Sequence, residues 1–249
     1  MSDLNKTAKN HKNALIDVEK KVEEALAPVA ATVLSYDLIK TFVLTRISEK
    51  LQSIPLDDII TPRLHIAAPA LASVRYLGRV EELKELYASL LACSMDVNTS
   101  TSVHPCFVQI ILQLSSDEAR LLAAFLNSNR EPLINIRNMR RDGSGGRDHF
   151  MYFTDLHERY GTKYPEYLRN YFDNFLRLGI AEIPENHELL DDGVYDALES
   201  HPDVVAMRKE INNEPGRRYA VTRTAIRLTG LGRQFVECCV RDRRNRSIE

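Results

Sequence analysis

The sequence has no apolar run long enough to cross a membrane. A membrane-spanning helix needs about 20 consecutive apolar residues, whereas the best run here covers only residues 25–34 and contains Pro28. The N-terminal stretch, MSDLNKTAKNHKN, is polar and lacks the apolar centre of a secretory signal peptide. We therefore expect a cytoplasmic protein with no membrane partner.

Cysteine is also scarce. The chain has four cysteines, Cys93, Cys106, Cys238 and Cys239, and none of them belongs to a C-x-x-C pair. Zinc sites and disulfide scaffolds use closely patterned cysteines, which are missing here. We interpret the four as buried free thiols, and we expect no metal and no other cofactor.

Neither sign of charge dominates the whole chain. Among its 249 residues, 44% are apolar and 27% charged, and 33 basic against 35 acidic side chains give a net charge of -2. This is the composition of an ordinary globular protein, and it excludes a fully disordered chain and a collagen-like repeat. The length allows one large domain or two smaller ones.

Residues 1–102 are predicted to form a helical region. Apolar residues recur every three or four positions from Leu15 to Leu26, and again over residues 39–51 and 80–95, which is the spacing of one helical face. Pro28 should kink or end the first helix, because proline lacks a donor and clashes with the preceding turn. Residues 55–69 contain three prolines and are predicted to form packed turns.

Residues 103–249 are predicted to mix helices and strands. Ser115 and Glu118 have the spacing of a capping box at a helix start. Alternating patterns predict strands over residues 132–139, 180–183 and 217–227, and a loop over 139–148. Helical patterns cover residues 164–178, ended by Gly179, and residues 228–240, begun by Thr229. A further acidic helix is expected as an insertion near residues 191–212.

Without the insertion, this order of elements is that of a winged helix, a helix-turn-helix framework with a small β-wing. We therefore predict a mainly α fold. In it, an N-terminal helical region packs on a winged-helix-like α+β C-terminal region.

Charge is unevenly distributed in the second region. From residue 182 to residue 203 there are eight acidic residues and no Lys or Arg, whereas residues 204–249 contain 11 basic and five acidic residues. Such asymmetry indicates a surface for nucleic acid or for an acidic protein, or else two blocks that neutralise each other in the fold.

Two sets of side chains are candidates for nucleic-acid contacts. The outward face of the predicted helix 164–178 supplies Arg169, Asn170, Asn174 and Arg177. Arginine and asparagine suit base edges, but Glu166 and Asp173 on the same face would repel phosphate. The predicted wing strand supplies the second set, which is Arg217, Arg218, Arg223 and Arg227. The basic tail 241–246 could add to it, because phosphate binding needs several cations.

The glycine-rich loop 143–146 is a weaker candidate. Arg140, Arg141 and Arg147 flank it, and a loop of this kind can cradle phosphate. It lacks the G-x-x-x-x-G-K-[ST] pattern, so we predict a mobile surface loop or a wing-like tip.

No catalytic residue is predicted. Five residues close in sequence could form the site of a metal-dependent nuclease, namely Asp148, His149, Asp155, His157 and Glu158. No two of these residues are four positions apart, as the two zinc-binding histidines of H-E-x-x-H are. We therefore interpret them as a solvated polar face. A Cys–His reaction centre at His104 and Cys106 lacks an orienting acid, so we expect His104 to cap a helix.

Several phrases, taken in order, resemble the bacterial Abi-alpha (abortive infection, alpha) family. They are ELKELYASLLACSMD at residues 82–96, VHPCFVQIILQLSSDEARLL at 103–122, LGI at 178–180 and LTGLGRQFVECC at 228–239. The resemblance covers roughly residues 55–240. It departs from the family pattern at Glu118, which precedes Ala119 where the family usually has Asp. The resemblance implies a link to defence against phage, and it implies no known catalytic residue, cofactor or substrate.

Our first hypothesis is a non-catalytic bacterial protein of phage defence that acts through protein–protein contacts, with a protein partner or as a homo-oligomer through its N-terminal helices. The alternative is a winged-helix regulator that binds nucleic acid. A metal-dependent nuclease is the weaker alternative.

Overall fold

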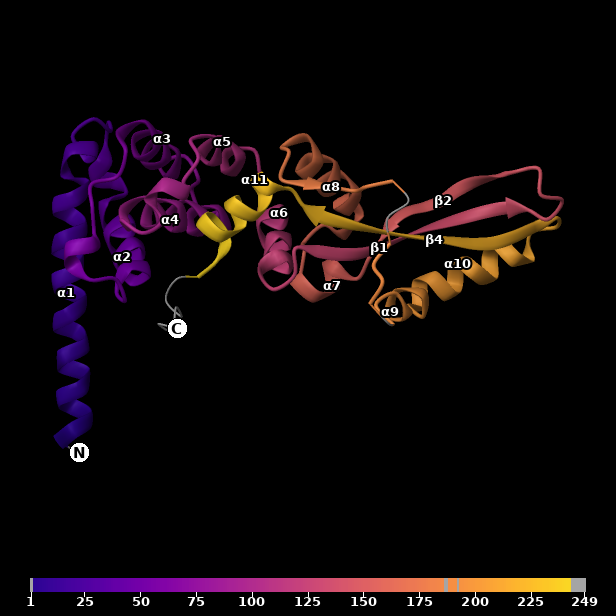
Figure 1. Ribbon diagram of the computed structural model, residues 1–249, viewed down its shortest axis with the longest axis horizontal. Helices are drawn as coiled ribbons and strands as arrows, with labels where there is room; N and C mark the ends of the chain where they lie inside the picture. Colours follow the sequence, from indigo (N-terminus) through magenta and orange to yellow (C-terminus); the bar gives the residue numbers. More distant parts are fainter. Residues whose placement is uncertain (1, 186–187, 192, 243–249) are drawn as a thin grey trace. The chain divides into compact units, whose positions relative to one another are not determined.

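The computed structural model describes residues 2–185, 188–191 and 193–242, and it is mainly helical with one antiparallel sheet (Figure 1). The chain forms two compact units. Unit 1 contains the residues up to Ala119 and those from Gln234 onward, and unit 2 contains Arg120–Arg233. Within the described part of the chain, no helix has both the length and the apolar character needed to cross a membrane.

Unit 1 is built from helices. They are α1 (Ser2–Ala30), α2 (Lys40–Leu51), α3 (Leu64–Val74), α4 (Glu81–Met95) and α5 (Cys106–Leu112), with three short 3-10 turns at Tyr36–Leu38, Leu56–Asp58 and Ser100–Ser102. The π-helical turn η6 (Val236–Val240) joins them from the C-terminal side.

Helix α4 is the centre of unit 1. Every residue from Leu86 to Met95 is buried, as expected of a helix that is enclosed on all sides. Helices α2, α3 and α5 and the turn η6 all pack against it. The sequence pattern of residues 80–95 predicted this helix correctly.

Two prolines of this unit, one expected to kink or end a helix and one expected in a turn, lie inside helices. Helix α1 continues for two residues past Pro28 and ends at Ala30. The prediction of turns up to residue 69 was wrong, because α3 runs through Pro69. Its apolar face, which includes Ile66, Ala70 and Leu71, is buried beside α4. That burial offsets the one backbone hydrogen bond that proline cannot donate.

The predicted capping box is confirmed. The Ser115 amide donates to Glu118 Oε2 at 2.6 Å, and the Glu118 amide donates to Ser115 Oγ at 3.3 Å. Helix α6 (Ser116–Leu121) and the 3-10 turn η4 (Leu122–Leu126) follow. The cap on α5 is also as expected, since the Cys106 amide donates to His104 Nδ1 at 3.1 Å. All four cysteines are free, and all but the half-buried Cys106 are buried.

Unit 2 contains a four-stranded antiparallel sheet in the order β2-β1-β4-β3. The strands are β1 (Arg130–Arg140), β2 (Gly146–Phe153), β3 (Ala181–Glu182) and β4 (Arg217–Leu228). Helices α7 (Leu156–Tyr160) and α8 (Leu168–Arg177) lie between β2 and β3 in sequence. Helices α9 (Asp196–Glu199) and α10 (Pro202–Asn213) lie between β3 and β4, and α11 (Gly230–Phe235) follows β4.

One face of the sheet carries the core that holds α9 and α10. Ile134, Ile136 and Ala225 from the strands pack with Leu198, Val204 and Ile211 from the helices. Strands β1 and β4 run side by side along their whole length, and Figure 1 shows them reaching well past α8. The sheet therefore presents a long arm with α10 against it.

Two predictions for this unit need correction. The predicted loop over residues 139–148 is too long, because β2 begins at Gly146, and the rest of this strand was not predicted; its sequence GRDHFMYF is polar at its start, and in the structure only Phe153 is buried. The acidic insertion forms two helices and not one, because His201 has an extended ψ of 138° before Pro202, which begins α10. The insertion's residues Asn186, His187 and Asp192 lie outside the described residues.

Candidate nucleic-acid interface

The end of the arm brings five of the predicted arginines together. Arg140 is the last residue of β1 and pairs with Arg217, the first residue of β4. Arg141 begins the turn after β1, Arg147 lies near the start of β2, and Arg218 follows Arg217. We call this set the basic tip, and it lies at the end of the sheet farthest from α8 (Figure 1).

Backbone contacts fix the two strands at the tip. The Arg141 amide donates to the Gly216 carbonyl at 2.9 Å, and Arg141 Nε donates to the Arg217 carbonyl at 2.8 Å. The Arg140 amide donates to the Gly145 carbonyl at 2.8 Å and closes the β1–β2 turn. Arg141 is thus a structural residue of the tip as well as a cation.

The turn itself holds one acid. Asp142 Oδ1 accepts from the Ser144 amide at 2.9 Å and from its hydroxyl at 2.7 Å. These two hydrogen bonds are the main reason why the pKa of Asp142 is lowered, and the nearby Arg140 charge lowers this pKa further. Gly143 and Gly145 have φ values of +79° and +110°, a region that glycine adopts without strain.

The arginines of the tip have few acidic partners. Arg147 Nη2 lies 3.9 Å from Glu214 Oε1, and Glu214 also accepts from Asn138 Nδ2 at 3.1 Å. Over the described ranges, no ion pair within 4.0 Å joins a carboxylate to the other four arginines, which are Arg140, Arg141, Arg217 and Arg218. Because successive strand residues point to opposite faces, Arg217 and Arg218 place positive charge on both faces of the arm.

The other two arginines predicted on the wing strand are engaged. Arg223 Nε lies 2.7 Å from Glu199 Oε1, and its guanidinium sits 5.2 Å from the centre of the Tyr195 ring. The hydrogen bond that Arg223 donates to Glu199 is the main reason why the pKa of Arg223 is raised. Arg227 Nε lies 2.8 Å from Glu182 Oε1. Here the acidic block neutralises part of the basic block within the fold.

The α8 candidates form a separate group. Asn170 is exposed, and Arg177 donates to Asn174 Oδ1 from Nε at 3.0 Å and from Nη2 at 2.6 Å. Arg169 is exposed and lies 6.0 Å from the Tyr152 ring centre. Glu166 and Asp173 are exposed on the same helix region. The neighbouring Tyr164 and Tyr167 were not predicted as site residues, although each follows a charged residue in the sequence, Lys163 and Glu166.

The basic tail lies largely outside the described part of the chain. Arg241 is described, and its Nε lies 2.6 Å from Glu237 Oε2. Residues 243–246 are outside the described residues.

Three residues of the hypothetical nuclease site pair with residues outside it, while His157 Nε2 lies 3.8 Å from Glu158 Oε1 within it. Asp148 Oδ1 lies 3.2 Å from Arg137 Nε, and Asp155 Oδ1 lies 3.5 Å from Arg159 Nε. Glu158 Oε1 lies 3.2 Å from His201 Nε2. Across residues 2–185, 188–191 and 193–242, no three His, Cys, Asp or Glu side chains are grouped as a metal site requires.

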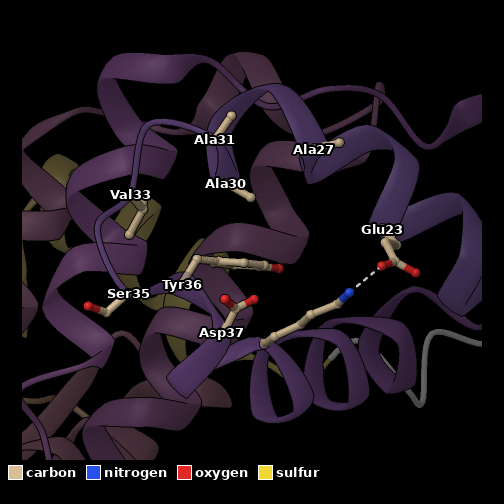
Figure 2. A pocket seen from close by; sticks show the side chains of 9 residues that line it. Glu23, Ala27, Ala30, Ala31, Val33, Ser35, Tyr36 and Asp37 are labelled. Atoms are coloured by element: carbon tan, nitrogen blue, oxygen red, sulfur yellow. Dashed lines mark ion pairs between the residues drawn. The ribbon is translucent and has the colours of Figure 1, made fainter.

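Unit 1 has a pocket of about 410 Å³ that contains none of the predicted residues. Figure 2 shows the Tyr36 ring reaching into it below Ala30. Lys40 Nζ lies 2.5 Å from Glu23 Oε1. Burial, followed by the charges of Glu23 and Asp37, raises the pKa of Tyr36 to about 12. The polar lining of this pocket is therefore acidic overall, in contrast to the basic tip.

The comparisons with known proteins are consistent with the resemblance seen in the sequence. No curated protein matches the chain. One similar solved structure is that of an uncharacterised protein from the hydrocarbon-degrading marine bacterium Alcanivorax borkumensis SK2. It is 20% identical with a TM-score of 0.35, over 58% of this chain and 96% of the other. The sequence profile of the family described as abortive infection alpha matches residues 35–239, most of the chain, so the chain belongs to the abortive infection alpha family.

Proposed function

We propose that this chain acts in abortive infection as a non-catalytic nucleic-acid-binding protein, and that the basic tip binds phosphates. The observation that carries the proposal is the gathering of five arginines at the tip. Among the carboxylates of the described residues, only Glu214 lies within 4 Å of any of them. Guanidinium groups bind phosphate in a bidentate way, and neutralising phosphates releases counterions, which supplies most of the affinity for nucleic acid.

The order of elements in unit 2 supports a winged-helix interpretation. Helices α7 and α8 precede β3, and β3, β4 and β1 are adjacent in the sheet, which is the arrangement of a helix-turn-helix followed by a wing. In this proposal the wing is the long arm, extended by β2 and backed by α10. The arm is the better phosphate surface, because the arginines of α8 lie beside Glu166 and Asp173.

The test is fluorescence anisotropy with labelled nucleic acid at about 50 mM and about 200 mM salt. The variant changes Arg140, Arg217 and Arg218 to Gln and keeps Arg141, whose side chain bonds to the Arg217 carbonyl. If four or five phosphates are contacted, wild-type affinity for duplex should fall about 100-fold or more between these salt concentrations. The variant should bind more weakly, with a smaller dependence on salt.

The matched control changes Arg223 and Arg227 to Gln. These two lie on the same strand, but each already pairs with a glutamate, so the loss should be smaller. Absence of binding at low salt, or an equal loss in the tip variant and the control, contradicts the proposal.

A second candidate function is docking of a protein partner or a second copy on unit 1. Leu34 and Tyr76 are 79% and 75% exposed, and Arg75 donates to the Leu34 carbonyl and to the Tyr76 hydroxyl. Exposed apolar and aromatic side chains around an arginine are typical of protein interfaces. Sedimentation of the wild type and of Leu34→Ser/Tyr76→Ser over a range of concentrations tests self-association. If the wild type remains monomeric at all concentrations, docking of a second copy is contradicted.

A further inference from the structure

Two exposed tyrosines precede α8. Tyr164 and Tyr167 are 47% and 51% exposed, and their ring centres are 6.3 Å apart with an angle of 57° between the planes. Tyr164 precedes a short 3-10 turn, Pro165–Tyr167, and Tyr167 is its last residue; the Tyr167 amide donates to the Tyr164 carbonyl at 3.1 Å. In a 3-10 turn the side chains at i and i+3 lie on the same side. The turn therefore presents both rings together.

The rest of the segment holds these rings in place. Tyr171 Oη donates to the Tyr164 carbonyl at 3.3 Å, and Tyr171, Phe172 and Phe175 bury the inner face of α8. The turn is thus attached to the core of unit 2, while its two rings remain at the surface. A base that stacked on them would not have to displace a core contact.

Lys163 and Arg169 lie on either side of the turn in the sequence. Lys163 Nζ is 5.4 Å from the Tyr164 ring centre, and the Arg169 guanidinium is 6.0 Å from the Tyr152 ring centre. Glu166 is the single acid among residues 163–169, so the segment is positive overall. Aromatic rings beside cations are the combination that binds single-stranded nucleic acid, in which the rings stack on bases and the cations attract the backbone.

We propose that Tyr164 and Tyr167 form a stacking surface for unpaired bases, so that the nucleic acid bound by this chain is single-stranded or contains a single-stranded segment. This inference rests on the proposed function. In an intact duplex, each base is covered on both faces by its neighbours, and these rings have no base to stack on. The tip arginines contact phosphates, which both forms of nucleic acid have, whereas the tyrosines discriminate between the forms.

The test compares labelled oligo(dT) with a labelled duplex of mixed sequence, using the full chain. Tyr164→Ala/Tyr167→Ala should weaken binding of oligo(dT) on the order of 10-fold or more and leave binding of the duplex nearly unchanged. Tyr164→Phe/Tyr167→Phe keeps the rings and should retain the binding of oligo(dT). Tyr76→Ala is a matched control, because Tyr76 is also exposed but belongs to unit 1.

A direct readout uses the absence of tryptophan from the sequence. Tyr167→Trp introduces a single tryptophan, whose fluorescence oligo(dT) should quench and duplex should not. This variant also covers the case in which the double alanine variant fails to fold.

The outcomes separate the two proposals. If the wild type binds duplex through the tip arginines but the tyrosine variants behave as the wild type with oligo(dT), the stacking surface is wrong and the proposed function stands. Equal losses on both nucleic acids, or a tryptophan that oligo(dT) does not quench, also overturn the stacking surface. If the wild type binds neither nucleic acid, the proposed function fails and this inference fails with it. If Tyr164 and Tyr167 bound a protein and not nucleic acid, the rings would be a protein contact and the stacking surface would be wrong.

Discussion

Arg140 on β1 and Arg217 on β4 stand directly opposite each other as the last pair of the β1–β4 ladder. Like charges in this position repel, and such a pair destabilises a sheet by about 0.2–1 kcal/mol. Over the described residues, neither side chain has an ion-pair partner within 4.0 Å to offset the repulsion. A repulsive pair at the end of a long arm favours a role for these charges in binding an anionic ligand.

Arg217→Thr should therefore have opposite effects on stability and on binding. Removing one charge and adding a β-branched residue should raise the free energy of unfolding by roughly 0.2–1 kcal/mol, while affinity for nucleic acid falls. The Arg217 carbonyl, which accepts from Arg141, is retained. Urea denaturation measures this increase in the free energy of unfolding. The increase should be smaller in about 1 M salt, because salt screens the repulsion between the two arginines.

Arg223→Thr is the control for this experiment, because it removes an ion pair with Glu199 and no like-charge contact. It should lower stability where Arg217→Thr raises it. A fall in stability for Arg217→Thr would show that the pair is not repulsive.

Glu199→Gln should increase affinity for nucleic acid. Glu199 neutralises Arg223 at 2.7 Å, and the substitution frees a cation on the same strand as the tip. If the freed arginine meets a duplex phosphate, the slope of log K against log salt should steepen by about 0.9. Anisotropy titrations at several salt concentrations measure this slope.

The matched control is Glu237→Gln, which also breaks a close pair, with Arg241 at 2.6 Å, and changes the net charge equally. It belongs to unit 1, whereas β4 belongs to unit 2. Equal increases in the two variants would mean that only net charge matters.

Gly232 is predicted to tolerate no side chain. A Cβ at this position would lie 1.8 Å from the Ile180 carbonyl oxygen, and no side-chain rotation can relieve an overlap with backbone. Gly232→Ala should destabilise the protein by about 3 kcal/mol or more. Gly230→Ala in the same helix is the control, because its nearest neighbour would be Arg233 Nη2 at 3.8 Å. Thermal unfolding followed by circular dichroism compares them, and equal midpoints would contradict the predicted overlap.

The sequence predicted most of the helices, and it named the arginines that the fold gathers in the basic tip. Sequence patterns predicted the structure correctly where interactions between residues close in the chain decide it, as in the Ser115–Glu118 capping box and the regular apolar face of α4. They predicted it wrongly where tertiary packing outweighs the local preference for helix, strand or turn. Pro69 lies inside α3 because the helix is packed on α4, and β2 forms because β1 offers it an edge, although its own residues are mostly exposed.

The candidate binding residues show the same division between what local sequence decides and what the fold decides. The sequence identified the arginines, but which of them are neutralised depends on strand register and on where α9 lies. Charge counting alone could not separate Arg223, which meets Glu199, from Arg218, which meets no carboxylate within the described ranges. The exposure of Tyr164 and Tyr167 depends on a 3-10 turn that replaces the first turn of the predicted helix.

Tyr36 should make the stability of unit 1 depend on pH in the alkaline range. Its pKa is raised to about 12 by burial and then by the charges of Glu23 and Asp37, whereas a tyrosine in an unfolded chain has a pKa of about 10. Between these values the folded protein keeps the proton that the unfolded chain releases. The free energy of unfolding therefore falls as the pH rises from about 10 to about 12, and below about 10 this contribution is fully present.

Tyr36→Phe removes the hydroxyl that titrates, so the variant should lose less stability than the wild type over this range. Urea midpoints of both proteins, measured near pH 9 and near pH 11.5, give the stability that each loses over this range. The other tyrosines contribute equally to both losses, so the difference between the two losses reports Tyr36. Tyr76→Phe, at an exposed position, is the control and should follow the wild type. Asp37→Asn should give an intermediate result, because it removes one of the two charges near the Tyr36 hydroxyl in the pocket of Figure 2. If Tyr36→Phe followed the wild type across the whole range, the phenol would be titrating at its ordinary pKa and the pocket would not be acidic.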